Sequence, residues 1–217
     1  MLPRLVPIVA ATSIVLASIT GHAGGWAVVS VEDLPEHFTV GKSTELKFTV
    51  RQHGMHLVPG LRARVTAIGD GREVDADAQP AEPGHYKATL TLPRAGKWNV
   101  TIHSGFGVAS ALNLRPIEAV APGTTVTPAA LALRGLDLFV AKGCNSCHYH
   151  GDTKTQPLAR VGEDLTDKRY SDGLLSMMLT NPAMIPKPDI WQMPDLKLQR
   201  QEVAALVAFI NKPRTRP

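Results

Sequence analysis

Two cysteines and one histidine stand within a five-residue segment, Cys144-Asn-Ser-Cys147-His148. This C-x-x-C-H spacing is typical of covalent attachment of a c-type haem. Each thiol adds across one vinyl group of a porphyrin, so two thiols this close together reach the same edge of the ring, and the adjacent imidazole can bind the iron. The chain contains two cysteines in all, which are too few for a zinc site, and a redox dithiol would need a βαβ setting. The sequence therefore predicts one haem, held by Cys144, Cys147 and His148.

The segments on either side of this motif have helical periodicity. Apolar residues recur on one helical face over residues 129–142 and again over residues 199–211. A shorter helix is expected over residues 171–180, where the pair Asn181-Pro182 would end it. We therefore expect an all-α domain over residues 129–217.

This all-α domain resembles the class I c-type cytochromes, which are small proteins with a single haem. The resemblance rests on Gly135-Leu-Asp-Leu-Phe139 before the motif and on Leu206-Val-Ala-Phe209-Ile210 in the last predicted helix. In that family the glycine and the aromatic residue pack against the C-terminal helix. Because a glycine inside a helix costs about 1 kcal/mol relative to alanine, we assign Gly135 a packing role. The resemblance implies a cytochrome c fold and electron transfer.

The family binds its iron through a second axial ligand, a methionine shortly before the last helix. Met193, followed by Pro194, has that position, and a soft thioether suits haem iron. Met184 lies in the same proline-rich stretch and is the alternative ligand. Met177 and Met178 fall inside a predicted helix, where methionine is more often a core residue. A filled sixth position on the iron favours an electron carrier over an enzyme.

Two lesser assignments concern the surroundings of His148. Pro157-Leu158 resembles a Pro-Leu loop of the family, in which the proline carbonyl accepts the Nδ1 proton of the histidine ligand. This sequence has Gln156 where the family commonly has glycine, and an ordinary loop proline is the alternative interpretation of Pro157. His150 is expected at the surface.

The N-terminal half has the periodicity of β-strands. Apolar and polar residues alternate over residues 44–50, 86–92 and 97–103, and segments rich in Gly and Pro separate these runs. Short strands at this spacing indicate an antiparallel, immunoglobulin-like sandwich of about seven strands. We expect this all-β domain over residues 24–117, followed by a stiff proline-rich linker over residues 118–128.

A looser resemblance concerns the same half of the chain. The phrases Gly84-His85-Tyr86 and Ala95-Gly96-Lys97-Trp98 are similar to the YtkA-like family of bacterial extracytoplasmic β-domains. This resemblance implies a fold and little about function.

One cluster in the β-domain could bind a metal. Imidazole and thioether groups suit copper, and His53, Met55 and His56 stand close together in the sequence. A copper-handling or oxidase-assembly protein with an attached haem domain is therefore an alternative function. The favoured role of the β-domain is docking on a partner or on a membrane complex.

The first 23 residues have the pattern of a secretory signal peptide. Arg4 precedes an apolar run, and small residues surround a cleavage site after Ala23. An uncleaved membrane anchor is the alternative interpretation. Either way, we expect the mature protein to be periplasmic or otherwise extracytoplasmic.

Charge excludes one class of partner. The formal net charge is +4, and Lys and Arg are scattered along the chain rather than clustered, whereas nucleic-acid binding needs a basic patch. We expect a one-electron carrier that exchanges electrons with a respiratory or dehydrogenase complex. A haem sensor with an open sixth iron position remains a further alternative.

Overall fold

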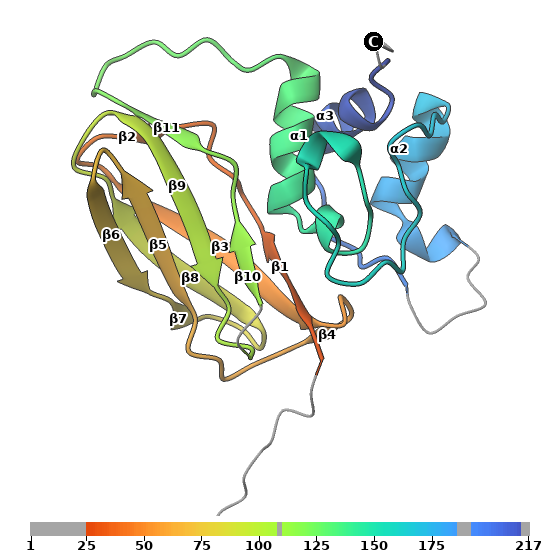
Figure 1. Cartoon of the computed structure of the whole chain (residues 1–217), viewed down its shortest axis with the longest axis horizontal. Coiled ribbons are helices and arrows are strands. Elements are labelled where there is room, and N and C mark those ends of the chain that lie inside the picture. Colours follow the sequence, from red (N-terminus) through yellow and green to blue (C-terminus); the bar gives the residue numbers. More distant parts are fainter. Residues whose placement is uncertain (1–24, 108–109, 186–191, 214–217) are drawn as a thin grey trace, which may run out of the picture.

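The computed structural model describes residues 25–107, 110–185 and 192–213. The predicted signal peptide, residues 1–23, lies outside these ranges. Within them the chain forms a β-rich domain and a helical domain, which pack side by side (Figure 1). No helix of the described part is both long enough and apolar enough to cross a membrane.

The β-rich domain is a sandwich of two sheets. The first sheet has the order β1 (Ala27–Val31), β3 (Ser43–Gln52), β8 (His85–Thr91) and β7 (Gln79–Pro80), with β4 (His56–Leu57) paired to β3. The second sheet has the order β2 (Phe38–Thr39), β11 (Ile117–Val120), β9 (Gly96–His103), β5 (Arg64–Gly69) and β6 (Arg72–Asp77), with β10 (Ala111–Asn113) paired to β9. The pair β2–β11 is parallel and the other pairs are antiparallel.

The three strands predicted from alternation are confirmed as parts of β3, β8 and β9. In β3 the side chains of Leu46, Phe48 and Val50 are fully buried, because alternate residues of a strand point to the same face. Four short strands of two or three residues (β2, β4, β7 and β10) accompany the longer strands that the periodicity predicts. Segments this short carry too few residues for a detectable alternation.

The connection between the domains is shorter than predicted. Residues 118–120 were expected in the linker, but they belong to β11, which pairs with β9 and β2. After β11 the chain arches over the molecule to the first helix (Figure 1), without helix or strand over residues 121–130.

The helical domain has the three expected helices, α1 (Leu131–Ala141), α2 (Asp172–Thr180) and α3 (Arg200–Ile210). Three short 3₁₀ turns lie between them: η1 (Cys144–Ser146), η2 (Gly151–Thr153) and η3 (Pro182–Met184). Two caps fix the starts of the later helices. The Ser171 hydroxyl accepts a hydrogen bond from the Leu174 N–H, and Gln199 and Glu202 form a capping box at α3.

Helices α1 and α3 cross at Gly135, as the resemblance implied. A Cβ atom built on Gly135 would lie 2.0 Å from the Ala205 carbonyl oxygen and 2.6 Å from the Phe209 Cβ. Phe139 and Phe209 fill the crossing with ring centroids 5.4 Å apart. The packing role assigned to Gly135 is therefore confirmed.

The expectation of a surface position for His150 is wrong. Its exposed fraction is 3%, and its ring lies 4.3 Å from that of Phe209, centroid to centroid. Burial is tolerated because His150 Nδ1 accepts a hydrogen bond from the Asp152 N–H at 3.2 Å.

Strand β1 is buried along its whole length, which shows that both of its faces are covered. Ala27, Val29 and Val31 belong to the sandwich core. Ser30, with the opposite orientation, donates a hydrogen bond from its hydroxyl to the Lys142 carbonyl of the helical domain at 2.9 Å. In Figure 1, β1 forms the edge of the sandwich that faces α1.

Candidate haem site

The end of α1 presents the two thiols and the imidazole together. Helix α1 ends at Ala141, and Gly143 follows with a φ of 74°, which is in the left-handed region that favours glycine. The chain then makes the turn η1, and the His148 N–H donates to the Cys144 carbonyl at 2.9 Å. Cys144, Cys147 and His148 therefore follow the helix within one compact turn.

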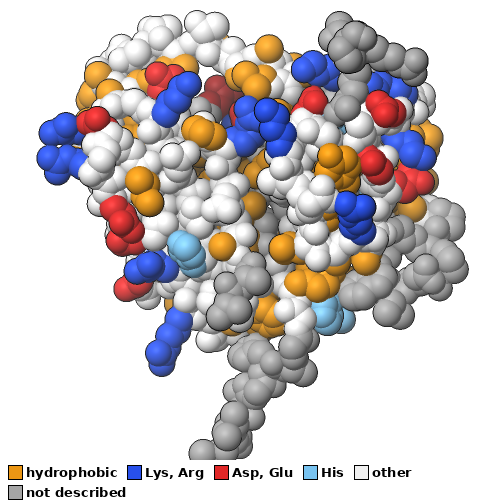
Figure 2. Space-filling model, in the orientation of Figure 1, with side chains coloured by type: hydrophobic (Ala, Val, Ile, Leu, Met, Phe, Trp, Pro, Cys, Tyr) orange, Lys and Arg blue, Asp and Glu red, His pale blue; other side chains and the backbone are white. Residues whose placement is uncertain are grey.

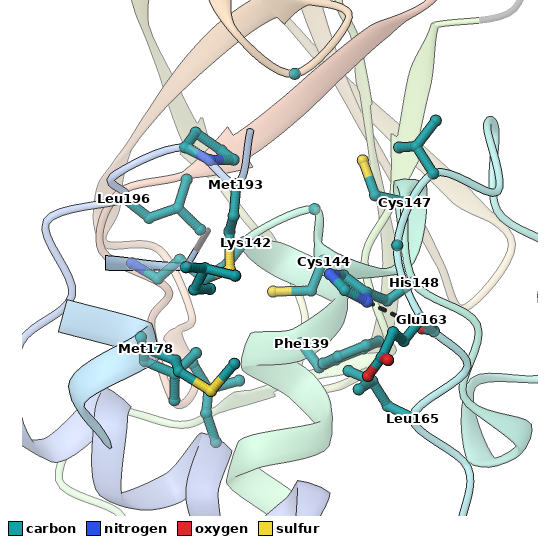
Figure 3. Close-up of a pocket in the computed structure, with 18 of the residues that line it drawn as sticks. Phe139, Lys142, Cys144, Cys147, His148, Glu163, Leu165, Met178, Met193 and Leu196 are labelled. Carbon is teal, nitrogen blue, oxygen red and sulfur yellow. Dashed lines mark hydrogen bonds between the residues drawn. The ribbon is translucent and has the colours of Figure 1, made fainter. Parts of the chain in front are cut away.

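These residues line a cavity of about 510 Å³. This volume lies within the range of roughly 300–1,000 Å³ that is usual for small-molecule and cofactor sites. Most of the wall is apolar and comes from the helical domain, including Phe139, Leu165 and Leu206. Figure 3 shows the Cys144 thiol, the His148 ring and the Met193 thioether around the same space.

A backbone carbonyl fixes the orientation of the His148 ring. Nδ1 lies 3.0 Å from the carbonyl oxygen of Glu163, drawn as the dashed line in Figure 3. Because a carbonyl can only accept, Nδ1 carries the proton and Nε2 keeps its lone pair for a metal. The His148 ring also packs closely against Gly162, because a Cβ atom built on Gly162 would lie 2.5 Å from His148 Nδ1.

This arrangement corrects the role assigned to Pro157. The acceptor of the His148 Nδ1 proton is Glu163, and Pro157 is a half-exposed loop residue. The reason is the register of the loop. The Gly162 N–H donates to the Cys147 carbonyl at 3.1 Å and the Leu165 N–H donates to the Tyr149 carbonyl at 2.9 Å, so residues 162–165 lie along the motif.

The surroundings of Cys144 favour the neutral thiol over the thiolate. Burial raises its pKa to about 12, and the neighbouring Cys147 thiol contributes to the shift. Dithiol exchange catalysts need the opposite, a cysteine with a lowered pKa. The environment therefore disfavours a redox dithiol.

The methionines divide into those that face the cavity and those that face solvent. Met193 and Met178 line the cavity. The alternative ligand Met184 is 57% exposed and Met177 is 48% exposed. The donor set of two thiols, one oriented imidazole and a thioether in an apolar cavity fits a covalently bound haem.

The two histidines of the predicted copper cluster lie in different surroundings. His53 lines the same cavity as Cys147, whereas His56 lies on the exposed strand β4. Across the part of the chain that the structure describes, no group of three or more His, Cys, Asp or Glu side chains could hold a metal ion.

Several residues of the site were not identified from the sequence. Glu163 acts through its backbone, Gly162 acts by having no side chain, and Val28 and Gly54 reach the cavity from the β-sandwich. Lys142, two residues before the motif, lines the cavity too.

Comparison with solved structures gives weak similarities. The filamin domain of Lin-41 is 12% identical, covers 42% of this chain and 91% of that one, and has a TM-score of 0.34. A superoxide reductase (neelaredoxin) from Ignicoccus hospitalis is 17% identical, covers 43% and 80% of the two chains, and has a TM-score of 0.30. The alpha-2-macroglobulin of E. coli is 17% identical with a TM-score of 0.35, covering 47% of this chain, and the match spans 6% of that protein's length. Similarity at this level says nothing about function.

No curated protein matches the sequence. The family model for cytochrome c matches residues 132–213, which include all of α1 but its first residue, the C-x-x-C-H motif, Met193 and α3. A cytochrome c domain implies covalently bound haem c and haem-based electron transfer. The helical half of this chain is therefore a cytochrome c domain.

Proposed function

We propose that the protein is an extracytoplasmic one-electron carrier with a single haem c. Cys144 and Cys147 would hold the porphyrin by two thioether bonds, and His148 and Met193 would bind the iron on its two sides. When bound, the haem supplies a one-electron ferric/ferrous couple. The chain itself would bind, orient and shield that couple without carrying out a reaction of its own.

The observation that carries the proposal is the bond between His148 Nδ1 and the Glu163 carbonyl. It makes Nε2 the unprotonated nitrogen of a ring that lines the same cavity as both attachment thiols. A carbonyl that accepts the Nδ1 proton also makes the imidazole a stronger donor through Nε2. Surface histidines have no need of such an arrangement.

Met193 is preferred to Met178 as the second ligand for reasons of position. Met193 stands on the extended segment between η3 and α3, and Figure 3 shows its sulfur directed toward the space in front of Cys144. Met178 belongs to α2, where its sulfur lies among apolar residues. A filled sixth position would favour an electron carrier over a haem sensor.

The partner would be a redox protein or a respiratory complex, with membrane association through that complex. On the face drawn in Figure 2, cationic and anionic side chains are interspersed, and neither sign covers a continuous area. Recognition would then depend on shape and apolar contact more than on electrostatic steering. We also propose that the β-sandwich is immunoglobulin-like and that it is related to the YtkA-like family.

The test is expression of the whole chain in a periplasm that carries the haem-attachment machinery. The expected product has a Soret band and a mass that exceeds that of the mature polypeptide by one haem. Replacing Cys144 and Cys147 by Ala should abolish covalent attachment. Wild-type protein that lacks the Soret band and weighs no more than its polypeptide would refute the proposal.

Single substitutions separate the two candidate methionines. Met193→Ala should remove the methionine-to-iron charge-transfer band and let the reduced protein bind carbon monoxide rapidly. Met178→Ala should retain the band. The reverse result would make Met178 the ligand, and rapid carbon monoxide binding by the wild type would indicate a sensor.

A further inference from the structure

We infer that the β-sandwich is a fixed wall of the haem pocket, which seals the Cys147 edge of the haem from water and raises its reduction potential. The inference rests on the proposed function, because it concerns the same haem.

Three residues of the sandwich line the cavity: Val28, His53 and Gly54. A Cβ atom built on Gly54 would lie 4.0 Å from the Cys147 Sγ and 3.7 Å from the Val28 Cγ2. Only a side chain as small as one methyl group would fit in this space, so the turn after β3 lies close to the second attachment thiol. When haem is bound, the edge held by Cys147 would therefore face the sandwich.

The sandwich also packs closely against Gly143, the residue before the motif. A Cβ atom on Gly143 would lie 2.5 Å from the Val28 Cγ1 and 2.7 Å from the Val29 carbonyl oxygen. Gly143 therefore has two reasons to be glycine, its left-handed backbone and the closeness of β1. Val28 is 4% exposed, although its side chain points away from the sandwich core.

A buried cation anchors the wall next to the cavity. The Lys142 side chain is 2% exposed and its Nζ lies 2.7 Å from Glu202 Oε1 of α3. The same Nζ donates to the Glu32 carbonyl of the sandwich, and the Ser30 hydroxyl donates to the Lys142 carbonyl at 2.9 Å. Both the side chain and the backbone of Lys142 thus hold β1 and the loop after it against the helical domain.

Further polar contacts cross the interdomain interface away from the cavity. They are Arg134 to the Leu34 and Pro35 carbonyls, Arg115 with Asp137 at 2.7 Å, and Gln199 with Asp33 at 3.0 Å. They connect the sandwich with both α1 and α3. The interface is therefore held at several separated points, which favours one fixed arrangement over hinged motion.

A dry wall has a definite electrostatic effect on haem. Oxidation adds one positive charge to the iron, and a poorly solvated site disfavours the added charge. The reduced state is then favoured and the reduction potential rises. Opening the wall should lower the potential and let polar reductants approach the haem edge.

The test compares full-length holoproteins that differ at neighbouring positions of β1. Val28→Ala removes two methyl groups from the wall, and Val29→Ala removes the same atoms from the sandwich core. A second wall variant, His53→Asn, removes the ring while keeping a residue that tolerates the φ of 52° at this position. The measurements are the midpoint potential, by spectroelectrochemical titration, and the rate of reduction by ascorbate.

We expect both wall variants to have a lower midpoint potential and a several-fold faster reduction by ascorbate than the wild type. Val29→Ala should lose stability but keep the wild-type potential. Haem-loaded wall variants with unchanged potential and unchanged rate would overturn the inference while leaving the carrier function intact. Failure of the wild type to attach haem would overturn both.

Discussion

The two domains differ in how their packing is determined. In the sandwich, alternate residues such as Phe48 and Val50 fill a shared core, and each is one of many contributors. Both domains contain glycines with no room for a side chain, but in the helical domain these lie at the two decisive contacts. Gly135 lies against the Ala205 carbonyl at the helix crossing and Gly162 lies against the His148 ring. Conservative changes in the sandwich core should therefore be tolerated at many sites, whereas a side chain at Gly135 or Gly162 should disrupt the helical domain.

The largest effect should follow from Gly135→Val. The new side chain would collide with the Ala205 backbone, where a Cβ atom alone comes within 2.0 Å of the carbonyl oxygen. We expect the helical domain to lose roughly 4 kcal/mol or more of stability, while the sandwich keeps its fold. Hydrogen exchange of peptides from α1 and β9 measures the two domains separately.

Gly173→Ala is the matched control for that variant. A Cβ atom on Gly173 in α2 meets nothing within 4 Å, so the change should stabilise the helical domain by about 0.5–1 kcal/mol. Equal losses from both substitutions would show that the close helix crossing at Gly135 is not the cause of the loss.

Glu202→Gln should have the next largest effect on stability, because it weakens the interface between the two domains. It removes the partner of the Lys142 ammonium, which is buried, at a cost of about 3 kcal/mol. Unlike Gly135→Val, it should speed hydrogen exchange in both β1 and α3. Faster exchange confined to α3 would mean that the pair serves the helical domain alone.

Tyr86→Phe tests the effect of one lost polar contact on the stability of the sandwich. The buried Tyr86 hydroxyl donates to the Val58 carbonyl at 2.7 Å and accepts from the Leu61 N–H at 3.1 Å. Losing the hydroxyl leaves both groups unsatisfied, which should cost about 2 kcal/mol. Chemical denaturation should show this loss in the transition of the sandwich, with the Soret transition unchanged. A shift of the Soret transition instead would mean that the domains unfold as one unit.

Tyr170→Phe should have the smallest effect on stability, with a distinct dependence on pH. Burial, followed by the hydrogen bond from its hydroxyl to Glu163, raises the pKa of Tyr170 to about 12. The value in the unfolded chain is about 10. Because the folded-state pKa is the higher one, the contribution of Tyr170 is complete below about pH 10 and is lost as the pH rises through about 12.

Urea denaturation at several pH values checks this prediction. The wild type should lose stability more steeply than Tyr170→Phe above pH 10, since the variant lacks the titrating phenol. Parallel losses in the two proteins would show that another group is responsible.

Much of the fold could be predicted because its elements have clear periodicity. The alternation in β3 and the helical stripes of α1 and α3 each place a buried face correctly. The end of α2 at Thr180 could be predicted because Asn181 and Pro182 follow it. The end of the sandwich was placed too early, since the four residues of β11 are too few for a pattern and lie next to prolines.

The site was predicted where side chains carry the chemistry and missed where the backbone does. The side chains of Cys144 and His148 indicate one cofactor. The backbone carbonyl of Glu163 has no sequence signature, because every residue has a backbone carbonyl. The contribution of Val28 could not be predicted either, since it depends on how two distant segments dock. His53 was selected for its ligand chemistry, yet the structure places it in the wall of the haem cavity.

The connection over residues 121–130 has a consequence for the interdomain interface. Because it ties the two surfaces into one molecule, each experiences the other at an effective concentration on the order of a millimolar. An association too weak to survive between separate proteins would then be closed nearly all the time. Cutting this tether would make the closed arrangement depend on protein concentration.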